Sequence, residues 1–145
     1  MTPTGLGPDV ESGLNRGHGQ LVLVVEDNDK NARLTVAMLD SAGYRTRLAS
    51  NGDDGLRLAG ELCPALIITD LQMPGLDGVD MTRALKSRAR TASIPVIAVT
   101  AHALTEHRHA ALTAGCCRFL PKPIRYRALL AEVADVIACE PTGTT

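Results

Sequence analysis

Five short predicted strands are separated by amphipathic segments along this chain, and this order narrows the possible folds more than any other feature. The strands are expected at 21–25, 44–48, 65–69, 94–99 and 116–120; the one at 44–48 alternates polar and apolar residues, and the others are mainly apolar. Strands that alternate with helices form a parallel sheet with helices on both faces and right-handed crossovers. We therefore expect an α/β fold, a three-layer doubly wound (βα)5 sandwich over residues 21–139. The polar, Gly-rich and Pro-rich ends at 1–20 and 140–145 are expected to be flexible tails.

The helical segments show which side chains are expected to face the sheet. The segment after the first strand is expected to be helical to about Ala42 and to bury Leu34, Ala37, Met38 and Ser41. The next helix is expected to place four residues on its inner face, namely Leu56, Ala59, Gly60 and Cys63.

Composition excludes several classes of protein. The chain has 145 residues, 45% of them hydrophobic, with a formal net charge of −1, which is typical of one globular domain and not of a nucleic-acid binder. Only three aromatic residues occur (Tyr44, Phe119 and Tyr126), too few for a base-stacking surface. No apolar run is long enough for a membrane helix, and no secretory signal is present.

The four cysteines form no CxxC pair, and they lie at Cys63, Cys116, Cys117 and Cys139. Cys116 and Cys117 are expected to begin the fifth strand and to face opposite sides of it. A metal or redox site is one interpretation. We favour the other, that these are small hydrophobic side chains in a reducing cytosol.

Polar side chains follow four of the five predicted strands. Glu26 and Asp27 follow the first strand, Asp70 the third, Thr100 the fourth, and Lys122 the fifth. Because the carboxyl ends of parallel strands share one edge, these groups are expected to converge where α/β sheets bind ligands. Mg²⁺ can neutralise such crowded carboxylates, and an ionised Asp can attack phosphorus. The set is therefore suited to phosphoryl transfer to Asp70.

Each of these residues also has a simpler interpretation. Glu26 and Asp27 could only cap the next helix, Thr100 could be an ordinary strand-end hydroxyl, and Lys122 a solvated surface lysine. The presence of all of them beside Asp70 favours the chemical interpretation.

The chain resembles the receiver (response regulatory, CheY-like) domain of bacterial two-component response regulators. The matching segments are Val24–Asn28, Asp70–Gly78, Ala98–Ala101 and Leu120–Ile124, in the order and spacing of that family, and the resemblance extends over roughly Gln20 to Cys139. It implies a flavodoxin-like sheet with strand order 2-1-3-4-5 and a receiver domain at 21–139, of the single-domain or hybrid-kinase type.

The resemblance implies that Asp70 is the phosphoacceptor of a phosphoprotein that forms an aspartyl phosphate. Glu26, Asp27, Asp70 and the backbone carbonyl of Gln72 would hold Mg²⁺ (or Mn²⁺). The protein would be a signalling receiver and not an enzyme, although it would assist its own phosphorylation and dephosphorylation. Glu at position 26 departs from the family's commoner Asp, but the family also uses this variant.

The resemblance also implies a switch. Thr100 would turn toward the phosphoryl group, Lys122 would pair with it, and the Lys122–Pro123 bond would be cis. Phe119 stands where the family often has Tyr, so it lacks the hydroxyl. Gln72 and His102 occupy the rim positions that the family uses to tune the phosphate lifetime.

The function implied is a cytoplasmic step of two-component or phosphorelay signal transduction. The partners would be a sensor histidine kinase or a histidine phosphotransfer protein and a downstream protein that binds the fourth helix, fifth strand and last helix. No DNA-binding domain and no membrane contact are expected. Whether the chain stands alone or is part of a longer kinase stays open. The alternatives are a docking module that needs no phosphorylation and, less favoured, a haloacid-dehalogenase-type phosphatase. The latter would have its nucleophile on the first strand and a second Asp two residues later, where this chain has Gln72.

Overall fold

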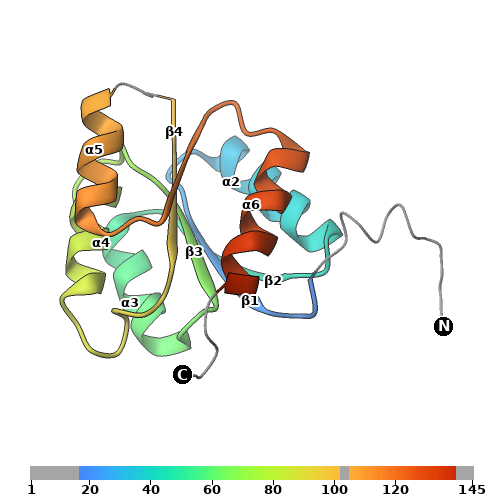
Figure 1. The fold of residues 1–145 in the computed structure, drawn as a ribbon, viewed down its shortest axis with the longest axis horizontal. Coiled ribbons are helices and arrows are strands. Elements are labelled where there is room, and N and C mark those ends of the chain that lie inside the picture. The colour runs from blue at the N-terminus through green and yellow to red at the C-terminus, as the bar shows by residue number, and fades with distance from the viewer. Residues whose placement is uncertain (1–16, 102–104, 140–145) are drawn as a thin grey trace, which may run out of the picture.

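Strands and helices alternate strictly along the part of the chain that the structure describes (Figure 1). The computed structural model describes residues 17–101 and 105–139. The elements are β1 (Leu21–Val25), α2 (Asp29–Ser41), β2 (Arg45–Ala49), α3 (Gly52–Leu62), β3 (Leu66–Asp70), α4 (Gly78–Lys86), β4 (Val96–Thr100), α5 (Thr105–Ala114), β5 (Arg118–Pro121) and α6 (Tyr126–Cys139). None of the described helices is long and apolar enough to cross a membrane.

The strands form one parallel sheet in the order β2-β1-β3-β4-β5, which confirms the predicted topology. The chain therefore reverses its direction of winding between β1 and β3. The register pairs Val25 with Thr69, Asp70 with Val99, and Thr100 with Pro121. These pairs place the ends of the central strands at nearly the same level of one sheet edge, where the polar residues follow.

Each face of the sheet is covered by its own set of helices. Figure 1 shows α2 and α6 on one side of the sheet and α3, α4 and α5 on the other. Successive side chains of each strand point to opposite faces of the sheet, so each face has its own hydrophobic core. Leu23 and Ile67 pack toward α3 and α4, whereas Val24 and Ile68 pack toward α2 and α6. Burial on both faces explains why β1, β3 and β4 are nearly continuous apolar runs, whereas the edge strand β2 carries the exposed Arg45 and Arg47.

Two glycines let loops approach each other below the carboxyl edge of the sheet. A Cβ on Gly78 would lie 2.2 Å from the carbonyl oxygen of Asp70, and a Cβ on Gly52 would lie 2.1 Å from that of Leu76. Only glycine fits at such distances, so the loop after β3 packs directly against the beginnings of α3 and α4.

The inner face of α2 differs from the prediction. The buried residues are Ala32, Thr35 and Leu39, whereas Leu34 is 53% exposed. Ala37 and Ser41 are also exposed. The helix is turned so that small side chains meet the sheet, and Leu34 lies outside the core.

Other local predictions also need correction. In α3 the buried residues are Gly52, Gly55, Leu58 and Ala59, and Cys63 is an exposed helix cap with φ of 46°. The fifth strand begins at Arg118, so Cys116 and Cys117 precede it. Cys116 is nevertheless buried and Cys117 is exposed. The amide of Cys116 donates to the carbonyl of Ala111 at the end of α5, and the amide of Cys117 donates to the carbonyl of Val96 on β4.

Residues 17–20 lie in the segment predicted to be a flexible tail, and they are hydrogen-bonded to the turn between α2 and β2. The amides of Gly17 and Gly19 donate to the carbonyls of Ala42 and Gly43, at 2.7 and 2.9 Å. The carbonyl of Gln20 accepts from Arg45 at 3.0 Å. These bonds attach residues 17–20 to the domain ahead of β1.

Candidate functional site

The carboxyl edge of the sheet gathers the polar residues that follow its strands. Glu26 and Asp27 come directly after β1, Asp70 ends β3, Thr100 ends β4, and Lys122 follows β5. Glu26 and Thr100 are buried, and Asp27 is exposed. The sheet order brings these residues together from four segments of the chain.

Three carboxylates form a compact cluster. Ligand oxygens of Glu26, Asp27 and Asp70 all lie within 4.8 Å of one another. The amide of Asn28 donates to Glu26 Oε2 at 3.2 Å, and the amide of Gln72 donates to Asp70 Oδ1 at 3.3 Å. Hard carboxylate oxygens at this spacing are the donors that Mg²⁺ prefers, so the residues present fit a magnesium site.

Lys122 bridges two of these carboxylates. Its Nζ donates to Glu26 Oε1 at 2.9 Å and to Asp70 Oδ2 at 3.1 Å. All three side chains are largely buried, at 14%, 6% and 10% exposed for Lys122, Glu26 and Asp70. The Lys122 amide donates to the Thr100 carbonyl at 2.9 Å, and the Lys122–Pro123 bond is cis, as expected. The backbone therefore holds this ammonium group over the acidic cluster.

Burial affects the pKa of two residues of this site, Glu26 and Lys122. Burial raises the pKa of Glu26, and the hydrogen bonds from Lys122 and Asn28 only partly oppose this effect. Burial alone would lower the pKa of Lys122, but hydrogen bonding to Glu26 and attraction to Asp70 raise it overall. Lys122 therefore stays charged beside Asp70, and its charge compensates the crowded carboxylates.

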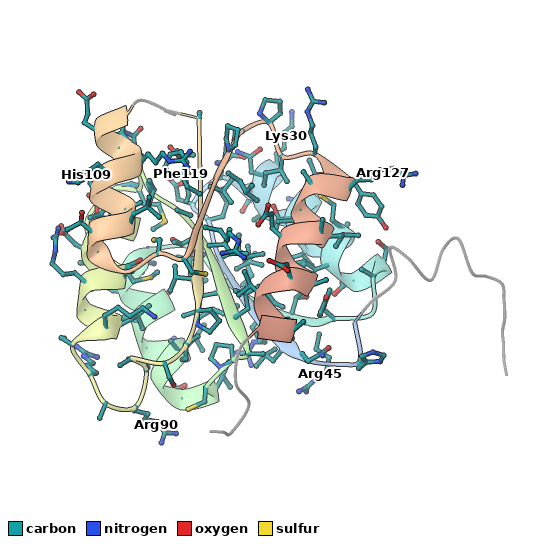
Figure 2. The ribbon with its side chains drawn as sticks, viewed as in Figure 1. Lys30, Arg45, Arg90, His109, Phe119 and Arg127 are labelled. Atoms are coloured by element: carbon teal, nitrogen blue, oxygen red, sulfur yellow. The ribbon has the colours of Figure 1, made fainter. Side chains whose placement is uncertain are left out.

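The remaining predicted site residues lie around this cluster. Phe119, on β5, is half-buried against the core on the α5 side of the sheet. Figure 2 shows its ring beside α5, and the Arg108 guanidinium carbon lies 5.8 Å from the ring centroid. Gln72 is exposed at the rim, directly after Leu71. His102 lies outside the described residues.

A groove beside Lys122 is a feature that the sequence did not reveal. It encloses about 320 Å³ and is lined by Asn31, Leu34, Thr35, Ala101, Lys122, Pro123 and Ile124. Most of its lining is apolar, and it opens next to the carboxylate cluster. The sequence signal for this groove is Leu34, an apolar residue that lies on the exposed side of α2. The helical periodicity assigned Leu34 to the core, so the groove was not predicted.

The model of one protein family matches most of the chain. Residues 22–134 match the response regulator receiver domain. Among curated proteins, the polar-differentiation response regulator DivK of Brucella anthropi is 39% identical over 103 residues, which are 71% of this chain and 84% of DivK.

Solved structures agree with this match. The receiver domain of a sensor histidine kinase from Pseudomonas aeruginosa, which has a magnesium ion in its active-site cleft, is 36% identical with a TM-score of 0.78. The alignment covers 83% of this chain and 98% of that one. The signal receiver domain of a histidine kinase from Syntrophus aciditrophicus is 30% identical with a TM-score of 0.77, over 83% of this chain and 91% of that one. The fold, the clustered acids and these matches together show that the chain belongs to the response regulator receiver domain family.

Proposed function

We propose that Asp70 accepts a phosphoryl group from a phosphohistidine. The observation on which this rests is the position of the Asp70 carboxylate, which lies between two other carboxylates and the Lys122 ammonium at the carboxyl edge of the sheet. An aspartate carboxylate can act as a nucleophile and form a covalent intermediate. Two-component response regulators, to whose family the chain belongs, act in signal transduction through this kind of exchange.

The transfer balances as a simple displacement. An Asp70 carboxylate oxygen forms a bond to phosphorus, the bond between phosphorus and the donor imidazole nitrogen breaks, and the imidazole leaves with its electron pair and takes up a proton. The transferring phosphoryl oxygens need positive charge around them. Lys122 would supply it by exchanging its contact with Asp70 for one with a phosphoryl oxygen, and the Thr100 hydroxyl would donate to another.

Glu26, Asp27, Asp70 and the backbone carbonyl of Gln72 would hold Mg²⁺ (or Mn²⁺). When bound, the ion supplies a charge that neutralises the transferring phosphoryl oxygens. The same residues would allow the domain to assist its own phosphorylation and dephosphorylation. Glu26 and Asp70 would keep their orientation through the amides of Asn28 and Gln72.

The acyl phosphate adds about two negative charges at Asp70. Thr100 and Phe119 would shift in response, and the face formed by α5, β5 and α6 would change its affinity for a downstream protein. The donor would be a sensor histidine kinase or a histidine phosphotransfer protein, and the exchange would take place in the cytoplasm.

The proposal is tested with acetyl phosphate and with beryllofluoride, each with Mg²⁺. With acetyl phosphate we expect mass spectrometry to find one added phosphoryl group, located at Asp70, and with beryllofluoride we expect saturable binding that requires Asp70. The Asp70→Asn variant should take up none, whereas Asp80→Asn, which removes an exposed carboxylate on α4, should react as the wild type does. Phosphorylation at another residue, or equal labelling of Asp70→Asn, would refute the assignment.

Gln72 and His102, which match the positions that the family uses to tune the phosphate lifetime, are proposed to set the lifetime of the phosphorylated state. Side chains there can admit or exclude the water that hydrolyses the acyl phosphate. We expect Gln72→Ala and His102→Ala to change the dephosphorylation rate, measured by loss of the phosphorylated mass with time. Rates equal to that of the wild type would show that neither residue has this role.

A further inference from the structure

Arg108 lies over the only phenylalanine of the chain. Its guanidinium carbon is 5.8 Å from the centroid of the Phe119 ring, which is within the range of a cation–π contact. Arg108 is exposed on α5, and Phe119 is half-buried on β5. The contact therefore joins two of the three elements of the face proposed to bind a downstream partner.

The position of the ring connects this contact to the phosphoacceptor site. Phe119 pairs with Ala98 across β4 and β5, and Thr100 lies two residues further along β4 on the same face of the sheet. Ala98 is small and fully buried, so the ring and the Thr100 side chain are neighbours on this face. A movement of Thr100 toward Asp70 changes the space available to the ring.

We propose that Arg108 is a positioning residue for Phe119 that holds the ring in its resting place, and this proposal rests on the proposed function. Phe119 has no hydroxyl that could hold the ring through a hydrogen bond. The guanidinium contacts the ring from the exposed side of α5, so a ring that follows Thr100 inward leaves the cation. The contact then stabilises the resting arrangement alone, and it opposes the change that phosphorylation favours.

The size of the effect follows from linkage. A contact of this kind at a partly exposed site changes an equilibrium by about two- to fivefold. The contact stabilises the resting state only, whereas a phosphoryl mimic binds the other, switched state. Loss of the contact therefore raises the affinity for the mimic by the same factor, until the switched state is fully populated. Removal of Arg108 should therefore strengthen binding of a phosphoryl mimic at Asp70, although the two sites do not touch.

The test uses the single Phe of the chain. Incorporation of 4-fluorophenylalanine labels Phe119 alone, and the fluorine NMR signal then reports its environment during titration with beryllofluoride and Mg²⁺. The variants are Arg108→Gln, which removes the cation, and Arg108→Lys, which retains one. Arg127→Gln is the charge-matched control, because Arg127 is exposed and lies at the start of α6, on the opposite side of the sheet from α5 (Figure 2).

We expect Arg108→Gln to bind beryllofluoride about two- to fivefold more tightly and to shift the resting fluorine signal toward the loaded position, with a melting temperature lowered by no more than a few degrees. Arg108→Lys and Arg127→Gln should resemble the wild type. In a Phe119→Leu background, which has no labelled ring, the affinity is measured from the fluorine signal of bound beryllofluoride. Arg108→Gln should no longer alter the affinity there, which excludes a general effect of charge on anion binding.

Unchanged or weaker binding by Arg108→Gln, with normal binding by the wild type, would overturn the role of Arg108 alone. The same holds if the gain persists in the Phe119→Leu background. A wild type that fails to bind beryllofluoride, or an Asp70→Asn variant that binds it equally well, would overturn the proposed function and this inference with it.

Discussion

At the scale of single residues, Lys122 has two roles that use the same charge. Its ammonium group compensates Glu26 and Asp70 in the described site, and it is proposed to bind a phosphoryl oxygen during transfer. A lysine that only stabilised the fold would not need to lie beside the nucleophile. The two roles can be separated, because the first one is measured by stability without any phosphodonor.

We expect Lys122→Met to lower the free energy of unfolding by about 2 kcal/mol in metal-free buffer, because two buried carboxylates lose a charged hydrogen-bond partner. Added Mg²⁺ should stabilise the variant more than the wild type, since the carboxylates then lack another cation. Urea unfolding with EDTA and with Mg²⁺ measures both effects. Lys30→Met, which removes an exposed lysine from α2, should change neither, and an equal response of both variants to Mg²⁺ would contradict the role of Lys122.

The buried thiol of Cys116 makes stability depend on pH in the alkaline range. Burial raises the pKa of Cys116 above the ordinary value of 9.0, although a hydrogen bond with Thr82 partly opposes this. Above pH 9.0 the unfolded chain therefore loses this proton before the folded chain does, so stability is present below that pH and falls as the pH rises further. The fall ends once the folded thiol also ionises.

We expect the free energy of unfolding to decrease above this pH by up to about 1.4 kcal/mol per pH unit on account of Cys116. Cys116→Ala should show a shallower decrease, measured by urea unfolding at a series of pH values. Identical slopes in the two proteins would show that Cys116 does not make this contribution.

At the scale of elements, the turn from β3 into α4 positions Asp70, the proposed phosphoacceptor, and Gly78 makes that turn possible. Ala at position 78 would place its Cβ against the Asp70 backbone, where no flexible side chain can yield. We expect Gly78→Ala to destabilise the domain by about 1–3 kcal/mol and to slow labelling by acetyl phosphate. Gly60→Ala is the matched control, because nothing lies within 4 Å of a Cβ there, and it should stabilise α3 by about 0.5–1 kcal/mol. Thermal unfolding and labelling rates measure the effects, and a Gly78→Ala variant as stable and reactive as the wild type would contradict the argument.

The elements also show what could and could not be predicted from the sequence. The meeting of Glu26, Asp70 and Lys122 at one edge was predictable, because parallel strands share their carboxyl edge whatever their exact ends. The strand order followed from the resemblance to receiver domains and not from the alternation of strands and helices. The inner faces of α2 and α3 were not predictable. The rotation of each helix about its axis depends on how small side chains such as Thr35 fit against the sheet. Hydrophobic periodicity cannot predict this, because it assigns the apolar Leu34 to the core in preference to the polar Thr35.

Errors of one or two residues at the ends of elements have a different cause. The segment predicted as the fifth strand begins at Cys116. The amide of Cys116, however, donates to the carbonyl of Ala111 at the end of α5, and β5 begins only at Arg118. The contact of Arg108 with Phe119 could not be predicted either, since it depends on the placement of α5 over the sheet. Such features follow from packing between elements and leave no local pattern.

At the scale of the whole molecule, the fold assembles a reactive edge and an adjoining apolar groove from distant segments. Glu26 and Lys122 are 96 residues apart in sequence and share a hydrogen bond. The groove beside them combines Leu34 of α2 with Ile124 of the segment before α6. A protein that brings a phosphohistidine to Asp70 has to cover this edge, so it would contact the groove, whereas a small phosphodonor would not.

This difference leads to a prediction about phosphodonors. We expect Leu34→Arg to slow phosphotransfer from a protein donor by about tenfold or more, because a charged side chain at an apolar contact of an interface costs more than 1.4 kcal/mol. Labelling by acetyl phosphate should be unchanged, since a small phosphodonor does not need the groove as a docking surface. The measurement uses histidine kinases and phosphotransfer proteins purified and phosphorylated with labelled ATP, and the donor is one that transfers to the wild type. Leu48→Arg, at a similarly exposed leucine on the edge strand β2, is the matched control and should accept phosphate normally. Equal slowing with acetyl phosphate would show that Leu34 affects the site itself, and equal rates with the protein donor would show that the donor docks elsewhere.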